Sequence, residues 1–377
     1  MRCFRLATTW IVSLPGIALM AVAQPLLART APVGNYAQTI AVGKCRPHLV
    51  SYPTISAAVA AAVPNALVLV CPGTYPEQVT ITTPLTLEGI KDATGTYPII
   101  TVPNGNWPNG LTQLSVLHTP LYGAPTVNIS NLVIDGSNSG VTCGSGVGLT
   151  GLAYEDADGA LENLEVRNQN PGGCGNGVGL SGGNIARNTV NVKECNIHDF
   201  DNTGIGVIST RAQPFSVNVN SSFVGSESAT AQAGINYFLV SGGTVSQNVI
   251  VVPTAQDGLR LETYYDGQIE GNTIIGANIG IEVDSDSSAT ITKNNLSNNG
   301  TGISLSPYSG YYTVSWNTIT LSGTAAINLN NCPAQSETAL VEYNTIFGAP
   351  VSIANVSSGD TLKQNIIEDA GAPTTCP

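Results

Sequence analysis

The chain has 377 residues and a formal net charge of −12, with 13 Lys and Arg against 25 Asp and Glu. The basic residues occur singly rather than in a stripe, which argues against nucleic-acid binding. A hydrophobic content of 42% is too high for a disordered chain. Only 10% of the residues are charged while 41 are Gly, so Ser, Thr and Asn must build much of the surface.

The N-terminus has the pattern of a secretory signal peptide. Arg2 and Arg5 precede a short apolar run that ends in small residues. We expect cleavage after Ala23, with Ala28 as the alternative, and loss of the two arginines changes the charge from −12 to −14. No later stretch has the ~20 apolar residues of a membrane helix. We therefore expect a secreted or extracytoplasmic protein, in the periplasm or at the cell surface, that is monomeric and has no membrane span.

Residues 53–65 predict a short helix followed by a strand. Ile55, Val59 and Val63 recur at helical spacing, and Thr54 is suited to be the N-cap. Cys45 lies before this helix and Cys71 directly after it, in the apolar stretch ALVLVC. Because an oxidising compartment permits disulfides, we predict that these two cysteines pair.

A repeat then runs through most of the chain. Its first landmark is an Asn, replaced once by Ser, at intervals of 21 to 33 residues. We expect each Asn to adopt a near-left-handed turn and to bond to the next repeat. Periods of this size indicate a solenoid. The landmark residues are Asn131, Asn163, Asn196, Ser222, Asn248, Asn272, Asn295, Asn317, Asn344 and Asn365.

The second landmark is a small residue followed by an aliphatic, a variable and another aliphatic residue. This alternation is typical of a strand, and no stretch after residue 64 sustains helical spacing. A propeller blade needs ~40 or more residues, so a parallel β-helix fits the period better. The second landmark begins at Gly146, Gly177, Gly204, Gly234, Gly258, Gly280, Gly302 and Ala326.

Residues 54–89, TISAAVAAAVPNALVLVCPGTYPEQVTITTPLTLEG, resemble the N-terminal segment of pectin-lyase-like right-handed parallel β-helix proteins, and the later repeats resemble their coils. The resemblance implies an all-β chain: a single-stranded right-handed parallel β-helix, with the short helix capping its open end. We divide the chain into a signal peptide (1–23), an N-terminal extension (24–51), the β-helix (52–369) and a C-terminal tail (370–377).

Seven cysteines remain once Cys3 leaves with the signal peptide, so at least one thiol is unpaired. CGSGVGL and CGNGVGL are near copies 31 residues apart, which would place Cys143 and Cys174 on neighbouring strands ~4.8 Å apart. A disulfide between them is predicted, with two buried thiols as the alternative. Cys332 and Cys376 are predicted to tie down the tail, which leaves Cys195 as the odd thiol.

In the resembling enzymes the active site lies on the outer face of the strand that carries the second landmark. The variable residue of that strand faces outward. In successive repeats it is Gly148, Gly179, Gly206, Asn236, Arg260, Glu282, Ser304 and Asn328.

Two consecutive repeats carry an unusual concentration of charge on this face. Glu262 follows Arg260 and Asp284 follows Glu282 at two-residue spacing, so the four should form one quartet. Mutual repulsion would raise the pKa of one carboxyl and suit it to be a general acid. A solvated, salt-bridged patch is the alternative. The charged residues are Asp257, Arg260, Glu262, Asp266, Glu282, Asp284 and Asp286, with Tyr264 and Tyr265 beside them as candidates for stacking on a sugar.

The same carboxylates suggest a metal site. Glu282, Asp284 and Asp286 offer the oxygen ligands that Ca²⁺ prefers, which makes calcium the one candidate cofactor. Calcium-assisted lyases also need an Arg or Lys base, and Arg260 is of the right kind.

Two other polar groups are weaker candidates. His198, Asp199 and Asp201 fall in a predicted loop and could bind a metal or relay a proton, or be plain surface. The triplet of Glu155, Asp156 and Asp158 lacks the downstream glutamate of a helix-loop-helix calcium site and is interpreted as a surface loop.

Enzyme signatures within the resembling superfamily are mostly missing. Of the polygalacturonase motifs only Asp257-Gly258 has a counterpart, and the epimerase Asp-Pro-His and the pectin methylesterase motifs are absent. Two hypotheses stay open: a polysaccharide lyase or hydrolase, and a non-catalytic β-helix that binds a glycan or serves as a surface structure.

Overall fold

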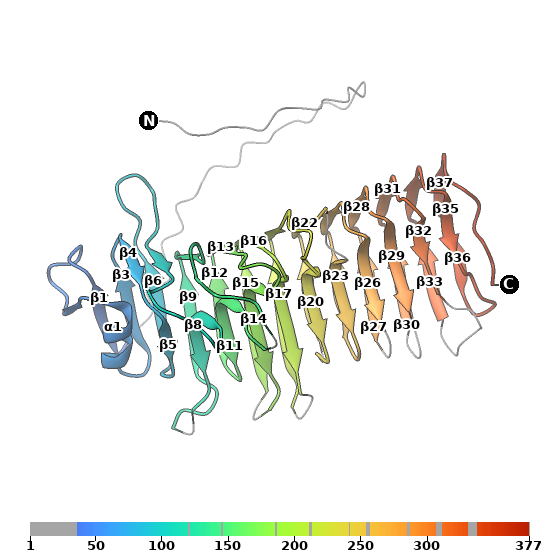
Figure 1. Cartoon of the computed structure of the whole chain (residues 1–377). Helices are drawn as coiled ribbons and strands as arrows, with labels where there is room; N and C mark the ends of the chain where they lie inside the picture. Colours follow the sequence, from blue (N-terminus) through green and yellow to red (C-terminus); the bar gives the residue numbers. More distant parts are fainter. Residues whose placement is uncertain are drawn as a thin grey trace. The chain divides into compact units, whose positions relative to one another are not determined.

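The computed structural model of the chain (Figure 1) describes residues 36–376 except for 120, 145, 185–186, 211–212, 241, 254–256, 285–286, 307–310 and 331–337. The predicted signal peptide and its cleavage site lie outside the described residues. No helix in the described part of the chain is long and apolar enough to cross a membrane.

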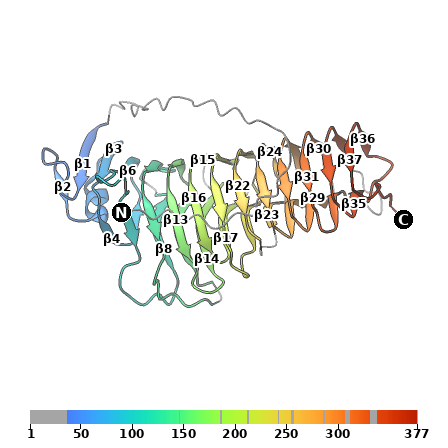
Figure 2. The ribbon, with the colours of Figure 1, turned by 90° about the horizontal axis from the view of Figure 1, so that it is seen from above.

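Three parallel sheets build the column of strands seen from two directions in Figures 1 and 2. The first, sheet A, has 14 strands in the order β2-β1-β3-β6 and then every third strand. Its strands are β1 (Gln38–Val42), β2 (Ser51–Tyr52), β3 (Ala66–Val70), β6 (Leu85–Gly89), β9 (Thr126–Ser130), β12 (Asp158–Glu162), β15 (Asn188–Lys193), β18 (Phe215–Asn220), β21 (Gly243–Ser246), β24 (Asp266–Glu270), β27 (Ser288–Thr292), β30 (Tyr311–Ser315), β33 (Thr338–Glu342) and β36 (Thr361–Lys363).

Sheet B follows sheet A in every repeat and has 12 short strands. They are β4 (Thr74–Pro76), β7 (Ile99–Thr101), β10 (Val133–Asp135), β13 (Glu165–Gln169), β16 (Asn196–Phe200), β19 (Phe223–Gly225), β22 (Val249–Val251), β25 (Thr273–Ile275), β28 (Asn295–Ser297), β31 (Thr318–Thr320), β34 (Thr345–Phe347) and β37 (Ile366–Glu368).

Sheet C completes each repeat and carries the second sequence landmark in most of its 11 strands. They are β5 (Val79–Ile81), β8 (Leu111–Leu117), β11 (Leu149–Glu155), β14 (Gly175–Gly182), β17 (Thr203–Ser209), β20 (Ala233–Phe238), β23 (Asp257–Glu262), β26 (Ile279–Asp284), β29 (Thr301–Ser306), β32 (Ala325–Asn328) and β35 (Val351–Ala354).

This succession of sheets confirms the predicted all-β right-handed parallel β-helix. One rung of three strands brings the chain back beside its starting strand, so equivalent residues stack along the column. The aliphatic residues of the second landmark point inward and form continuous buried files. One such file, in sheet C, consists of Leu152, Val178, Ile205, Ile235, Leu259, Ile281, Ile303, Ile327 and Ile353.

Helix α1 (Ile55–Ala61) is the predicted helix, shorter than the segment 53–65. The Thr54 hydroxyl accepts a hydrogen bond from the Ala57 N–H, as an N-cap does. Ile55 and Val59 are buried, and α1 packs against β1, β2 and β5 at the first rungs. Val63 is 43% exposed, because the helix ends before it. Strand β1 lies inside the stretch 24–51 that the sequence assigned to an extension.

The predicted column of stacked asparagines is present, but in some rungs the stacked residue is one position away from the predicted one. From Asn248 onward each carboxamide oxygen accepts the backbone N–H of the preceding rung, which makes a buried ladder. Asn294 belongs to this ladder, whereas the predicted Asn295 is exposed and begins β28. The ladder runs through Ser222, Asn248, Asn272, Asn294, Asn317, Asn344 and Asn365.

The left-handed backbone predicted for the ladder asparagines belongs to the residue before them. Gln247, Lys293 and Trp316 have φ of 57°, 56° and 59°. Asn131 and Asn163 share that preceding position, with φ of 62° and 52°. The predicted row of asparagines therefore combined residues from two adjacent positions of the turn, which differ in backbone conformation.

Two predicted disulfides are present among the described residues. Cys45–Cys71 and Cys143–Cys174 each have a Cα–Cα distance of 5.6 Å. Cys195 is a free, buried thiol, as predicted. Cys376 is disulfide-bonded, but Cys332, its predicted partner, lies outside the described residues.

The Cys143–Cys174 pair forms for a reason other than the predicted one. Leu149 pairs with Gly175 and Tyr154 with Leu180, so the register between β11 and β14 is 26 residues rather than 31. The two near-identical heptapeptides therefore do not occupy equivalent places. Cys143 reaches Cys174 from the loop before β11.

Candidate functional site

The outer face of sheet C is hollowed along the strands from β5 to β23. Two adjoining hollows of about 780 and 610 Å³ share residues on β8, β11 and β14. We call them together the groove. The shared lining residues are Thr112, Thr150, Glu155 and Asn176.

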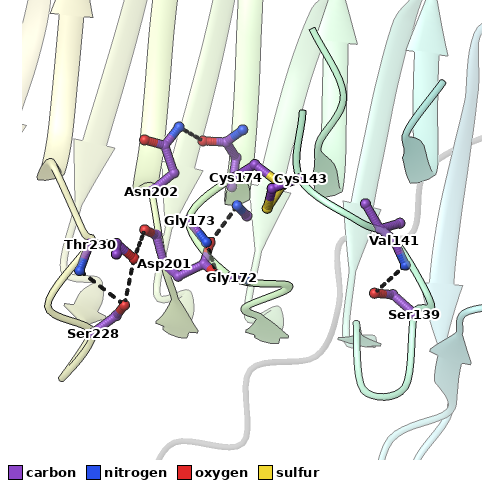
Figure 3. The surroundings of a disulfide bond; sticks show 12 residues. Ser139, Val141, Cys143, Gly172, Gly173, Cys174, Asp201, Asn202, Ser228 and Thr230 are labelled. Atoms are coloured by element: carbon purple, nitrogen blue, oxygen red, sulfur yellow. Dashed lines mark hydrogen bonds between the residues drawn. A yellow bond between two sulfur atoms is a disulfide. The ribbon is translucent and has the colours of Figure 1, made fainter. Parts of the chain in front are cut away.

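Loops that lead into the sheet C strands form one wall of the groove. The residues 146–148, 173–174 and 202 line it from this side. The Cys143–Cys174 disulfide connects two of these loops (Figure 3). Beside it, the Asp201 carboxylate accepts hydrogen bonds from the N–H groups of Gly172, Gly173 and Gly175 at 2.5 to 2.6 Å. The wall is thus held by both covalent and charge-assisted bonds.

The floor of the groove is deep because small residues form it. Gly179 and Gly206 occupy the outward column of β14 and β17, next to Ala153 of β11, so no long side chain fills the centre of the groove. Gly148 was predicted to belong to this column. It instead lies before β11, opposite the Cys174 backbone, and Ala153 takes its place.

The predicted quartet adjoins one end of the groove. Arg260 pairs in register with Glu282, and Glu262 pairs with Asp284, on β23 and β26. Glu262 also lines the groove directly. The structure therefore brings the four side-chain positions together on one outer face.

One guanidinium nitrogen contacts three carboxylates in this cluster. Arg260 Nε lies 3.1 Å from Glu282 Oε2, 3.4 Å from Glu262 Oε1 and 3.8 Å from Asp257 Oδ2. The Asp257 side chain is only 4% exposed, whereas those of Glu282 and Glu262 are 18% and 20% exposed. Three acids therefore share one cation, and the most buried of them stands behind the other two.

The shortage of positive charge changes the protonation of the cluster. Burial, and secondarily the charge of Glu282, raise the pKa of Asp257 from 3.8 to about 7. Burial also raises the pKa of Glu282, against the opposing effect of Arg260. A hydrogen bond joins the two carboxyls, and it raises the pKa of Asp257 while lowering that of Glu282. Below about pH 7 the proton of this pair therefore resides mainly on Asp257.

The two tyrosines differ from each other, and only Tyr265 contradicts the prediction. Tyr265 is fully buried, its hydroxyl donates to the Gly243 carbonyl at 3.0 Å, and its ring packs edge-on against Tyr237. It belongs to the core and cannot contact a sugar. Tyr264 is 37% exposed with φ of 68° in the turn after β23.

The candidate calcium ligands are only partly described. Glu282 faces Arg260, Asp284 ends β26, and Asp286 lies outside the described residues. Within the described ranges, no group of three or more His, Cys, Asp or Glu side chains is arranged to hold a metal ion.

His198 lies on a different face from the quartet. It is part of β16 in sheet B, not of a loop, and bridges Asp199 Oδ2 at 2.7 Å and Glu165 Oε1 at 3.3 Å. The hydrogen bond with Glu165 raises the pKa of His198. Because the Asp201 carboxylate is taken up by backbone N–H groups, the three predicted residues do not form one site.

The acidic triplet is not a surface loop. Glu155 ends β11 and faces the groove, whereas Asp156 is buried and binds the Asn184 backbone and amide at 2.9 and 2.7 Å. Asp158 begins β12. Glu155 shares an outward column with Phe238 and Glu262, a relation that follows only from the strand register.

Comparison with known proteins agrees with this architecture. Residues 215–369 match the family model described as "Right handed beta helix region". No curated protein matches the chain by sequence. This chain has a right-handed parallel β-helix fold.

Solved structures with this fold resemble the chain at low sequence identity. The A-module of the Azotobacter vinelandii mannuronan C-5 epimerase AlgE4 superposes with a TM-score of 0.61 at 16% identity, over 85% of this chain and 91% of that one. The AlgE6 A-module gives 0.58 at 16% identity, over 86% and 90%. The GH136 lacto-N-biosidase of Eubacterium ramulus gives 0.60 at 12% identity, over 90% and 68%. These similarities establish the fold of the chain.

Proposed function

We propose that this protein is an extracytoplasmic carbohydrate-active enzyme that hydrolyses a glycan bound along the groove. The observation that carries the proposal is the Asp257–Glu282 carboxyl pair, which shares one proton at the end of a long open groove. A pair of carboxyls with separated proton affinities is what acid-base cleavage of a glycosidic bond requires. The two described disulfides and the signal-peptide pattern support an oxidising location.

In this proposal Glu282 delivers the proton. Glu282 is more exposed than Asp257 and can reach the glycosidic oxygen, while Asp257 stands behind it and supplies the shared proton. As the oxygen is protonated, the bond from it to the anomeric carbon breaks. A water oxygen then bonds to that carbon and passes a proton to Glu262, the carboxylate on the same strand as Asp257. The proton count balances, and no other reactant is needed.

Arg260 suits an electrostatic role rather than that of a base. Its guanidinium contacts three carboxylates, and giving up its proton would leave all three without a counter-charge. Arginine is also not deprotonated in proteins under ordinary conditions. This contact pattern favours hydrolysis over the arginine-assisted lyase reaction that the sequence left open.

A panel of polysaccharides, assayed with and without a chelator, tests the proposal. We expect new reducing ends without the ultraviolet absorbance of unsaturated sugars. Asp257→Asn and Glu282→Gln should lower the rate by roughly 10² to 10⁴, the usual contribution of general acid-base catalysis. Glu342→Gln, on β33 in sheet A, is the matched control and should leave the rate unchanged.

Two outcomes would contradict this assignment. Unsaturated products would show a lyase instead. Binding of a glycan without turnover, unaffected by Asp257→Asn, would favour the non-catalytic alternative, for which the groove alone suffices.

A further inference from the structure

The groove and its charged end carry an excess of negative charge. The acids that line or adjoin it are Glu155, Asp257, Glu262, Glu282 and Asp284. Arg260 is the one cation found there among the described residues, and it is shared by three of these carboxylates. No described Lys, Arg or His lines either hollow.

The remaining described cations of the strands lie elsewhere. Arg167 is in β13 of sheet B, where it pairs with Asp135 and Glu165. In sheet A, Lys193 ends β15 beside Glu162, and Lys363 ends β36. Since the rungs place sheets A and B on other faces of the column, these charges do not compensate the acids of sheet C. A carboxylate ligand in the groove would meet repulsion from Glu155 and Glu262 and find no free counter-charge among the described residues.

The rest of the groove surface offers neutral groups. Thr112, Thr150 and Asn176 present hydroxyl and amide groups on three successive strands. The Asn236 Oδ1 atom, on the strand beside Arg260, is buried and has no hydrogen-bond partner in the described part of the structure. It is an acceptor suited to a sugar hydroxyl.

An apolar strip adjoins the catalytic cluster. Ile208, which is 50% exposed, and the half-buried Phe238 occupy neighbouring places in the outward column that continues to Glu262. The C–H face of an uncharged sugar packs well on such side chains. From β5 to β23 the groove crosses seven strands, and their six spacings of ~4.8 Å make about 29 Å. This length fits an oligosaccharide rather than a single sugar.

We propose that the groove takes a neutral glycan, a chain of uncharged sugars, and excludes polyuronates. The inference rests on the proposed function and specifies its substrate class. The acids exclude sugars that carry carboxylates, while the neutral hydroxyl and amide groups along the floor and the Ile208–Phe238 strip suit uncharged sugars. The fold neighbours that act on mannuronan do not share this substrate class.

Binding of two sets of polymers tests the inference separately from catalysis. The Asp257→Asn protein is run in affinity gels that contain neutral polysaccharides, such as galactan, xylan and glucomannan, or the polyuronates polygalacturonate and alginate. We expect retardation by at least one neutral polymer and by neither polyuronate, at low and at moderate salt. Retardation or cleavage of a polyuronate by the parent chain would overturn the inference while leaving hydrolysis intact. Failure to bind or cleave any polymer would overturn the proposed function itself.

Two substitutions in the groove sharpen the test. Phe238→Ala should weaken binding of the neutral polymer about tenfold, through loss of the apolar contact. Glu155→Lys should allow salt-sensitive binding of polyuronate if charge is what excludes it. Glu88→Lys on β6 of sheet A makes the same charge change away from the groove and should not. If Glu155→Lys and Glu88→Lys behave alike, local charge is not the selective feature.

Discussion

The two halves of the column are built to different rules. From Asn248 to Asn365 the turn between sheets A and B repeats one hydrogen-bonded asparagine, which is buried as far as Asn344. Connections such as the one between β25 and β26 are only three residues long. In the earlier rungs the equivalent positions are Leu132, Leu164 and Cys195, and 13 residues join β10 to β11. The repeated asparagine turns stabilise the later half of the column, whereas irregular loops form the wall of the groove in the earlier half.

The family model follows the same division. It matches residues 215–369, the part where the ladder repeats, and not the rungs that carry most of the groove. A repeated turn has one structural solution that recurs in sequence, whereas a binding surface varies from rung to rung. The regular rungs therefore match the family model and carry the hydrogen-bonded ladder, but they contribute little to the groove. The four predictions below test this division.

The largest stability effect is expected within the ladder. Asn294→Ala removes the acceptor for the Asn272 N–H and the donor to the Ile269 carbonyl, all of them buried. The unsatisfied groups should cost about 4 kcal/mol in the free energy of unfolding by urea. Asn295→Ala, the adjacent exposed position, is the control and should cost less than about 0.5 kcal/mol. Equal losses would contradict the ladder register.

Removal of the Cys143–Cys174 disulfide should destabilise the irregular half by about 3.7 kcal/mol, as expected for a closed loop of 31 residues. Because this bond holds one wall of the groove, the Cys143→Ser, Cys174→Ser double variant should raise KM more than it lowers kcat. Cys45→Ser with Cys71→Ser, at the capped end, serves as the comparison and should leave KM unchanged. An unaltered KM in the first variant would separate the wall from substrate binding.

The charged cluster should make stability depend on pH. Asp257 ionises near pH 3.8 in the unfolded chain but near 7 in the folded chain, so the folded state binds more protons between these values. Its contribution is therefore fully present below about pH 4, falls as pH rises to about 7 and is constant above. Asp257→Asn should gain about 3.5 kcal/mol over the parent between pH 4 and pH 8, at 1.36 kcal/mol per pKa unit, measured by urea unfolding. A parallel pH dependence in both proteins would argue against the raised pKa.

The smallest effect is expected at the first helix. Thr54→Ala removes the N-cap of α1 and should cost about 1 kcal/mol. Thr54→Ser keeps the hydroxyl and should restore most of the loss in the same unfolding measurement. A larger loss would mean that α1 contributes more to closing the column than one hydrogen bond accounts for.

The sequence was sufficient for the fold because inward aliphatic residues must recur at each rung. It placed Arg260 beside Glu282 correctly, since both follow the same Gly-aliphatic pair. It misplaced Gly148 and Asn295, because a local motif cannot reveal a bulge or loop that shifts the register by a residue or more.

The sequence also did not reveal which side chains are buried. Tyr264 and Tyr265 are adjacent in sequence, yet a positive φ at Tyr264 sends only the second ring into the core. Glu155 was interpreted as part of a surface loop, because the other members of its column lie 26 to 107 positions later, from Ser181 to Glu262. Only stacked registers make that relation visible.

The ladder also makes the rungs interchangeable units. Asn248 donates to Asn272, and Asn272 donates to Asn294 by the same two bonds at nearly the same lengths. Excision of residues 272–293 would therefore join two compatible ends, with Asn248 meeting Asn294 directly and the column shorter by one layer of about 4.8 Å. Such a shortened chain would keep its architecture but lose Glu282. Gain and loss of whole layers can thus change the chemistry of this scaffold without changing how it folds.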